Sequence, residues 1–437
     1  MDGTIDTSSF ETEIHGLRWV PRWRINNGQK DSFVVPFPTT HPVNIVFHGE
    51  SEFRYGQYGV HLGQQDVLTF LGDANQLVHA KFIDCRKDSP TFRRKVEFCF
   101  SPTSGRTLII PPGVAHTFHG LENVFTLNSY DLFLPSIEML CDRETMWSPE
   151  NDIINLPEDI APEDVSAYFA MTEEASDLVY HRLGALQEEN LRGYAFQHAE
   201  TRDFILDDGK RITLRLKEKI QEQDSVSLKT SKINGVVFKV LPFMKTGDES
   251  GIVALTRRSP LYLVEHGSTH YDFDSYGLHL GQEDHLVFLG DSKKEITLKL
   301  VDMREGSATL FVEDEVVFNP SPGVELVIPC GVAHAFFNMT DVVTVNRPVL
   351  YRGEIGDYLP GHDVIDWPLS NTDYVSFRVN KILVGDDFYM SVVVKQKEAM
   401  SEYSTYSTPK SVIVYDELSG KYVKVVLKEK MLDEPLG

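Results

Sequence analysis

Short segments of alternating apolar and polar residues follow one another along most of the chain. Residues 78–86, VHAKFIDCR, begin with strict alternation, which is typical of a strand with one packed and one exposed face. Residues 107–113, TLIIPPG, form an apolar run that ends in a proline turn, as expected of a strand buried on both sides. Glycine, proline or aspartate bounds most segments, so the pattern predicts an all-β protein of the jelly-roll barrel type. Minor helices are expected, the main one over 162–190, where proline and acids precede apolar residues at helical spacing.

One part of this pattern occurs twice. Residues 58–73, YGVHLGQQDVLTFLGD, and residues 276–291, YGLHLGQEDHLVFLGD, are identical at twelve of sixteen positions. The offset of 218 residues, from His61 to His279, also relates Pro111 to Pro329 and Asn128 to Asn346. The chain is therefore a tandem duplication.

The duplication predicts two barrel domains of similar size. We expect the first over residues 1–224, with a helical and β extension at its end, and the second over 225–437, with a β extension. The two copies would form a pseudo-dimer within one chain, and further homo-oligomerisation stays open.

Charge and hydropathy restrict the partners. The chain has 42 basic and 65 acidic side chains, a net charge of −23, which repels nucleic acid and anionic membranes. No apolar stretch is long enough for a membrane span, and no signal peptide is recognisable, so we expect a cytoplasmic protein. The four cysteines have no paired spacing, which argues against a disulfide framework.

A motif with fixed spacing marks each copy. Residues 105–116, GRTLIIPPGVAH, and 323–338, GVELVIPCGVAHAFFN, fit G-x5-P-x-G-x2-H-x3-N, the second motif of cupin barrels. Only the last position of the first copy departs, where Gly120 replaces asparagine. The turn would present His116 and His334 at the barrel mouth.

The first cupin motif is incomplete for metal binding. Metal cupins carry H-x-H followed by glutamate, whereas here Gly63 and Gly281 stand in place of the second histidine. A metal site of His279, Glu283 and His334 remains an alternative, because two imidazoles and a carboxylate suit iron, zinc or manganese. The matching residue of the first copy is Gln65, a poor ligand, so the preferred interpretation has no metal and no other cofactor.

An ordered series of motifs resembles the dTDP-4-dehydrorhamnose 3,5-epimerases and related sugar isomerases. YGLHLGQ is similar to their R-G-L-H-x-Q, and FIDCRKDSPTF, residues 82–92, to their V-D-L-R-x-x-S-P-T-F. IPPGVAHTF and VIDWPLSNTD, residues 364–373, match later motifs in the same order. The resemblance covers most of both halves and implies metal-free cupin barrels.

The resemblance also implies roles for individual residues. His61 and His279 match the catalytic base, and an imidazole can remove a proton beside a ketone at neutral pH. Asp373 matches the aspartate that orients this histidine. The expected substrate contacts are His116, His334, Asn128, Asn346, Tyr58, Tyr276, Gln64 and Gln282.

Three family positions differ in this chain. The arginine before G-L-H is Tyr58 or Tyr276, the lysine falls near Gln65 or Glu283, and the acid tyrosine falls near Asn128 or Asn346. Loss of one donor to an enolate oxygen typically costs about 100- to 1000-fold in rate.

The sequence thus predicts an epimerase or ketoisomerase acting on a sugar, or sugar nucleotide, with a 4-keto-6-deoxy ring. The second half is the stronger candidate, since it has the complete turn motif and Asp373. Two alternatives stay open: a catalytically silent sugar-binding or scaffold protein, and a metal-dependent cupin enzyme.

Overall fold

The chain folds into two compact units. The computed structural model describes residues 10–26, 32–51, 55–133, 153–157, 196–205, 211–219, 228–241, 243–245, 250–269, 273–353, 364–402, 410–416 and 421–427. Unit 1 comprises residues 1–22, 41–225 and 241–257, and unit 2 comprises 23–40, 226–240 and 258–437. The contiguous division at 224/225 is therefore wrong for two segments, 23–40 and 241–257, which lie in the unit of the other copy.

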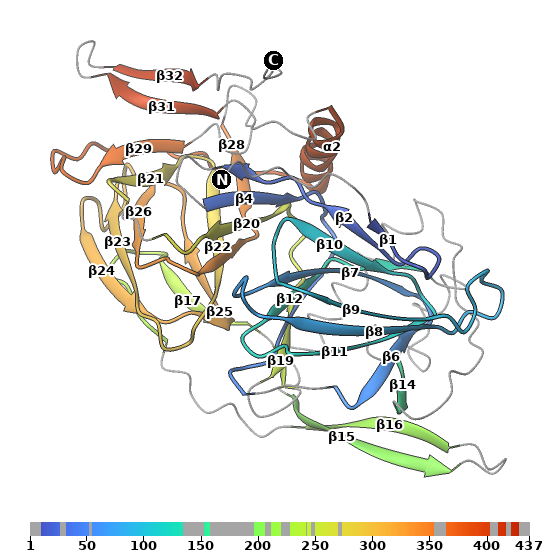
Figure 1. The fold of residues 1–437 in the computed structure, drawn as a ribbon. Helices are drawn as coiled ribbons and strands as arrows, with labels where there is room; N and C mark the ends of the chain where they lie inside the picture. The colour runs from blue at the N-terminus through green and yellow to red at the C-terminus, as the bar shows by residue number, and fades with distance from the viewer. Residues whose placement is uncertain are drawn as a thin grey trace. The chain divides into compact units, whose positions relative to one another are not determined.

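Unit 1 has eight barrel strands in jelly-roll order. They form two sheets with the orders β10-β7-β12-β5 and β9-β8-β11-β6, and the chain changes sheet after every strand except between β8 and β9, as in a double-sheet jelly roll (Figure 1). The strands are β5 (Val43–Phe47), β6 (Gln57–His61), β7 (Gln64–Leu71), β8 (Val78–Asp84), β9 (Lys95–Phe100), β10 (Arg106–Ile110), β11 (Val114–His119) and β12 (Phe125–Asn128).

Unit 2 repeats this topology. Its sheets have the orders β25-β22-β27-β20 and β24-β23-β26-β21. The strands are β20 (Leu261–His266), β21 (Ser275–His279), β22 (Gln282–Leu289), β23 (Ile296–Asp302), β24 (Glu313–Phe318), β25 (Ser321–Ile328), β26 (Val332–Phe337) and β27 (Val343–Asn346). The all-β, jelly-roll prediction is confirmed.

Each unit contains two neighbouring strands from the other copy of the repeat, one of which pairs directly with a barrel strand. Strand β19 (Gly251–Leu255) pairs with β5 in unit 1, and its repeat equivalent β4 (Ser32–Phe37) pairs with β20 in unit 2. Each copy keeps its first strand, β2 (Arg18–Pro21) on β10 or β17 (Val237–Val240) on β25. The exchange is reciprocal and satisfies the backbone groups at the edge of each sheet.

Further strands extend the sheets, and one helix follows the second barrel. The strands are β1 (Phe10–Glu11), β3 (Ile25–Asn26), β13 (Asp131–Leu132), β14 (Ile153–Pro157), β15 (Phe196–Ile205), β16 (Arg211–Lys219), β18 (Phe243–Lys245), β28 (Val349–Arg352), β29 (Val364–Pro368), β30 (Ile382–Leu383), β31 (Lys410–Asp416) and β32 (Lys421–Leu427). Helix α2 spans Asp386–Glu402 and begins with two acids, as a helix N-terminus prefers. It is anchored within unit 2 by Tyr389, whose hydroxyl accepts a hydrogen bond from the Leu350 N–H at 3.0 Å. The sequence did not indicate this helix, and the helix expected over 162–190 lies outside the described residues.

The core of each unit lies between its two sheets. In unit 1 Phe70 and Leu108 from one sheet pack with Phe82 and Phe118 from the other. Full burial of such a side chain contributes roughly 1.5–3 kcal/mol. This packing fixes the distance between the two sheets.

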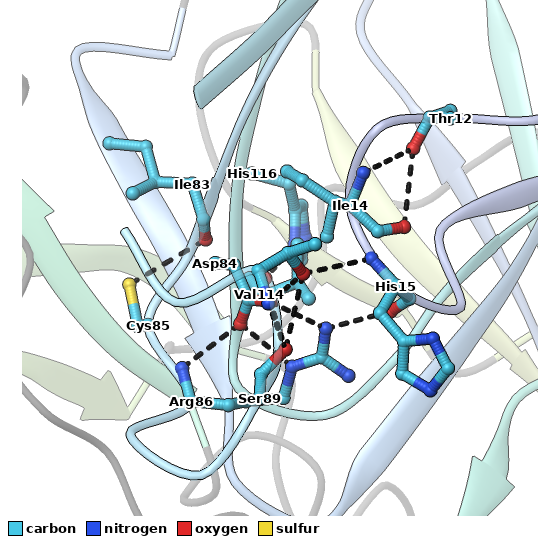
Figure 2. A network of polar contacts seen from close by, with 11 residues as sticks. Thr12, Ile14, His15, Ile83, Asp84, Cys85, Arg86, Ser89, Val114 and His116 are labelled. Carbon is cyan, nitrogen blue, oxygen red and sulfur yellow. Dashed lines mark hydrogen bonds and ion pairs between the residues drawn. The ribbon is translucent and has the colours of Figure 1, made fainter. Parts of the chain in front are cut away.

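A hydrogen-bonded turn closes β8 beside the histidine strand β11. Asp84, fully buried, accepts hydrogen bonds from the Arg86 guanidinium and from the hydroxyls of Ser89 and Thr91. Burial alone would raise the pKa of Asp84, but these donors together hold it below its usual value. Arg86 also donates to the His15 carbonyl, so the turn ties the N-terminal segment to the barrel (Figure 2). The Asp84–Arg86 pair is structural, and Asp302 with Arg304 repeats it in unit 2.

Two further expectations concern cysteines and membranes. Cys85, Cys99 and Cys330 are free thiols, and Cys141 lies outside the described residues. Among the helices that the structure describes, none has the length and apolar character needed to cross a bilayer.

Candidate functional site

A tight hairpin and the proline turn position the two histidines of unit 1. His61 ends β6, and only Leu62 and Gly63 separate it from β7. The Gly113 N–H of the proline turn donates to the His61 carbonyl at 2.6 Å, and His116 follows on β11. Gly113 has φ 78°, a left-handed conformation that glycine adopts without strain. The turn motif therefore fixes both histidines relative to each other, with ring centroids 5.9 Å apart.

A carboxylate from the opposite sheet lies between the two rings. Asp66 Oδ2 on β7 is 3.4 Å from His116 Nε2 and 3.7 Å from His61 Nε2. The side chains of His61 and His116 are 11% and 12% exposed, so both imidazoles point inward yet remain accessible to solvent. The cluster thus joins the two sheets through three groups that can bind protons or metal ions.

Two amides hold the other oxygen of this carboxylate. Gln64 Nε2 donates to Asp66 Oδ1 at 2.6 Å, and Asn128 Nδ2 donates to the same oxygen at 2.8 Å. Asn128 Oδ1 in turn accepts the Val67 N–H at 3.1 Å. The predicted substrate ligands Gln64 and Asn128 therefore orient Asp66 and leave Oδ2 directed at the histidines.

Unit 2 contains the same cluster. Asp284 Oδ2 is 3.6 Å from His334 Nε2 and 3.8 Å from His279 Nε2, and the two rings are 6.0 Å apart. Gln282 and Asn346 each donate to Asp284 Oδ1 at 2.8 Å. Asp284 Oδ2 is buried and accepts no hydrogen bond within the described part of the chain.

The tautomer of the second histidine is set by the backbone. His116 Nδ1 lies 3.2 Å from the Val114 carbonyl, and His334 Nδ1 has the same contact with Val332. A carbonyl only accepts, so Nδ1 carries the proton and Nε2 offers a lone pair toward the carboxylate. Burial lowers the pKa of His116 and His334, the nearby aspartate partly opposes this, and the other histidine lowers it further. Both rings are therefore neutral at pH 7.

The sequence interpretation missed the aspartates. Asp66 and Asp284 are identical between the copies and stand five residues after the hairpin histidine, which is the signal that could have identified them. The expectation that Glu283 supplies the carboxylate of the alternative metal site is wrong. Its side chain lies on the face of β22 opposite to that of Asp284 and contacts His285 at 2.9 Å. Because unit 1 also supplies a carboxylate, both units are equally equipped, contrary to the preference for the second half.

The expectation that Tyr58 and Tyr276 contact the substrate beside the histidines is also wrong. Tyr58 and His61 are an odd number of positions apart on β6, so their side chains lie on opposite faces. Tyr58 packs instead with Val60 and Ile83, and Tyr276 occupies the equivalent position among Leu278 and other apolar groups.

Asp373 does not orient His279. It is exposed, follows β29 in a turn where its N–H donates to Asn371 Oδ1, and makes no ion pair with His279 among the described residues. Asp284, delivered directly by the next strand, is the carboxylate beside His279.

The departure at Gly120 has a conformational reason. Gly120 has φ 72°, and Asn338 at the same point of the second copy has φ 62°. Glycine and asparagine are the residues that tolerate this left-handed region best. A Cβ at Gly120 would lie 2.5 Å from the Leu77 carbonyl oxygen, so glycine also suits the local packing.

Comparison with solved structures returns cupin-type proteins at low similarity. The chain is 17% identical to the rmlC epimerase of Mycobacterium tuberculosis, covering 28% of this chain and 66% of that one, with a TM-score of 0.22. The chain is 16% identical to the Bacillus anthracis dTDP-4-dehydrorhamnose 3,5-epimerase with TDP and PPi bound. This match covers 32% of this chain and 92% of that one, with a TM-score of 0.20. The chain is 11% identical to the oxalate decarboxylase of Lactobacillus farciminis, and the match covers 79% of this chain and 88% of that one, with a TM-score of 0.23. These overlaps are too low to support any statement about activity.

Comparison of sequences gives one family. No curated protein matches the chain. Residues 75–138, which include His116 and Asn128, match the family model described as dTDP-4-dehydrorhamnose 3,5-epimerase. Over this part of the first copy, the match confirms the family resemblance that the ordered motifs indicate.

Proposed function

We propose that each unit catalyses proton transfer beside the carbonyl of a keto sugar, as an epimerase or ketoisomerase. The observation that carries the proposal is the pair of inward imidazoles around one aspartate, built twice in the chain. The family match over residues 75–138 supports a 4-keto-6-deoxy sugar linked to a nucleotide as the substrate class.

In the proposed reaction, His61 or His279 is the base. Its Nε2 takes the proton from the carbon beside the ketone, and the electron pair of that C–H bond moves onto the carbonyl oxygen as an enolate. Return of a proton from solvent to the opposite face of the same carbon gives the epimer. Return of the proton to the former carbonyl carbon, while the hydroxyl proton of the first carbon moves to the enolate oxygen, gives the isomeric ketone. The adjacent Asp66 or Asp284 stabilises the imidazolium, because an opposite charge within about 4–6 Å favours the charged form.

The second histidine fits the role of a second base better than that of an oxyanion donor. His116 is neutral with its proton on Nδ1, so Nε2 has no hydrogen to give. In the reverse direction it can accept a proton from the other face of the sugar ring, and in the forward direction the proton for that face comes from solvent. The side-chain amides of Gln64 and Asn128 each donate one N–H to Asp66 Oδ1.

Solvent deuterium wash-in tests this proposal. The full chain is incubated in deuterated buffer with a dTDP-4-keto-6-deoxy sugar, and NMR monitors the protons at C3 and C5. We expect exchange in the wild type, a reduced rate in His61→Asn and in His279→Asn, and none in the double variant. Exchange that is unchanged in the double variant would contradict the role of these histidines.

One specific observation favours a second candidate, a metal-dependent cupin enzyme. One ring nitrogen of His61, one of His116 and one oxygen of Asp66 all lie within 4.8 Å of one another, and the same holds in unit 2. Ligands at about 2.1 Å around a tetrahedral ion are about 3.4 Å apart, close to the observed separations. The buried Asp284 Oδ2, which accepts no hydrogen bond among the described residues, is oriented as a ligand oxygen would be.

The surrounding contacts also fit an ion. Metal-binding histidines usually donate the other ring N–H to a carbonyl, as His116 and His334 do. A bound ion would supply a Lewis acid for the carbonyl oxygen.

Metal analysis separates the two candidates. We expect a metal-dependent enzyme to contain close to two equivalents of iron, zinc or manganese per chain, falling to about one in Asp284→Asn. Deuterium exchange that continues at full rate after chelation would exclude it and support the histidine base.

A further inference from the structure

One side chain on the inner face of unit 1 has a buried polar atom that the proposed reaction does not use. Asn44 on β5 is the register partner of Asn128 on β12, so the two side chains lie on the same face of the sheet (Figure 1). Asn128 donates to Asp66, which identifies this face as the inner one. Asn44 therefore lies one strand away from the asparagine that holds the histidine–aspartate cluster.

The order of the strands places Asn44 on the strand that faces His61. The orders β10-β7-β12-β5 and β9-β8-β11-β6 end in two consecutive strands of the chain, β5 and β6, which face each other in a jelly roll of this topology. His61 ends β6, and its imidazole points inward. A ligand that contacts His61 therefore has β5 on its other side.

Solvent reaches this part of the inner face, but it does not reach the amide oxygen of Asn44. The neighbouring Val43 and Ile45 point to the outer face and are fully buried, whereas Asn44 and its register partner Ala254 on β19 are only partly buried. Asn44 Oδ1 itself is buried and accepts no hydrogen bond from the residues that the structure describes. Because buried polar atoms normally have a partner, this oxygen indicates a group supplied by a ligand.

The second copy satisfies the same position within the protein. Tyr262 follows Asn44 at the repeat offset of 218 residues and is the register partner of Asn346, as Asn44 is of Asn128. Its hydroxyl accepts a hydrogen bond from Gln396 Nε2 of α2 at 2.8 Å. The barrel therefore does not require an amide here, and the larger phenol ring takes space that unit 1 leaves beside its cluster.

We propose that Asn44 is a ligand-binding residue that determines the selectivity of unit 1, where its Oδ1 accepts a hydrogen bond from a hydroxyl of the sugar. A sugar hydroxyl is a donor suited to an amide oxygen, and the small Ala254 side chain lies next to Asn44 on the inner face. Unit 2, with Tyr262 at this position, binds the same sugar without this contact and more weakly. The inference rests on the proposed function for its ligand class, a sugar nucleotide.

Calorimetric titration of the full chain with dTDP-glucose tests the contact. This probe keeps the hexose hydroxyls and has no ketone, so it can bind but cannot undergo the proposed proton transfer. We expect the wild type to bind it at two sites of unequal affinity, and Asn44→Leu to weaken the tighter site about three- to tenfold. We expect dTDP, which lacks the hexose, to bind equally to both proteins.

Two controls separate binding from folding and one unit from the other. Without ligand, Asn44→Leu should melt no lower than the wild type, because an apolar group replaces a buried amide oxygen that accepts no hydrogen bond among the described residues. Asn44→Ala repeats both measurements with a smaller side chain. Tyr262→Phe, the matched change in unit 2, should leave the affinity of the tighter site unchanged.

The outcomes distinguish this inference from the proposed reaction. Unchanged affinity of the tighter site in Asn44→Leu, an equal loss of affinity for dTDP, or lower melting temperatures in both Asn44 variants would overturn the role of Asn44. If the wild type does not bind dTDP-glucose, this role and the sugar-nucleotide class both fail. Absence of deuterium wash-in would contradict the proposed reaction alone, since the titration does not depend on turnover.

Discussion

Asp66 Oδ2 lies 3.4 Å from Nε2 of His116, although the two residues belong to opposite sheets of the barrel. The aspartate is 4% exposed at its side chain, and two amides fix its second oxygen. This relationship, repeated between Asp284 and His334, makes the aspartate the centre of each cluster.

Replacement of Asp66 or Asp284 tests whether the aspartate is needed for the proposed proton transfer. Asp66→Asn and Asp284→Asn keep the shape but remove the charge that favours the imidazolium, so we expect deuterium wash-in by the altered unit to fall at least about tenfold. Each rate is measured in the background of the other unit's histidine variant, so that only one unit is active. Glu283→Gln, on the opposite face of β22, is the matched control and should keep the full rate.

The asparagine on β12 links the site to the fold. Asn128→Leu leaves the buried Val67 N–H and Asp66 Oδ1 each without one partner, so we expect a loss of about 1–3 kcal/mol in the free energy of unfolding. Urea unfolding measures the loss, with the exposed Asn75→Ala as control. A loss in Asn128→Leu no larger than in the control would show that these hydrogen bonds do not stabilise unit 1.

Two buried histidines predict how stability depends on pH. Burial lowers the pKa of His48 and of its repeat equivalent His266 from 6.5 to about 4. The unfolded chain therefore binds protons that the folded chain does not, so stability is full above pH 6.5 and falls as the pH drops toward 4. Chemical denaturation at pH 7, 6, 5 and 4 should show this slope, and His48→Gln with His266→Gln should flatten it. An equal slope in the double variant would assign the acid sensitivity to other groups.

The left-handed backbone conformation at Gly120 predicts different stabilities for two substitutions at this position. Gly120→Asn introduces the residue that the second copy uses at this φ, whereas Gly120→Val places a β-branched residue where such residues are rarely found. Both add a Cβ near the Leu77 carbonyl, so the difference between them isolates the backbone conformation. We expect the valine variant to melt at least several degrees below the asparagine variant, an amount that corresponds to roughly 1 kcal/mol or more. Equal melting temperatures in a thermal scan would contradict this account.

The sequence predicted the fold and the histidines because local rules determine both. Alternation and turn residues specify strands, and the proline motif has a fixed spacing that brings His116 beside His61. It did not predict that β4 and β19 change units, because a strand's pattern does not specify which sheet edge it joins.

The errors in the site have a common origin in strand parity. Tyr58 and Glu283 were assigned by their position in family motifs, but the two-residue period of a strand turns both side chains away from the histidines. The same period places Gln64 and Asp66 together on the inner face of β7. Counting odd and even positions from Gln64 along the predicted strand selects Asp66 over Gln65, because only Asp66 shares a face with Gln64.

Deuterium wash-in by chelator-treated full chain, with and without added metal, tests the central claim most directly. The account predicts that the sugar protons beside the ketone exchange with solvent in the chelator-treated wild type, and that His61→Asn with His279→Asn abolishes the exchange while the chain stays folded. Failure of the chelator-treated wild type to exchange these protons would contradict it, and exchange that returns only with added iron, zinc or manganese would support the metal-dependent enzyme instead.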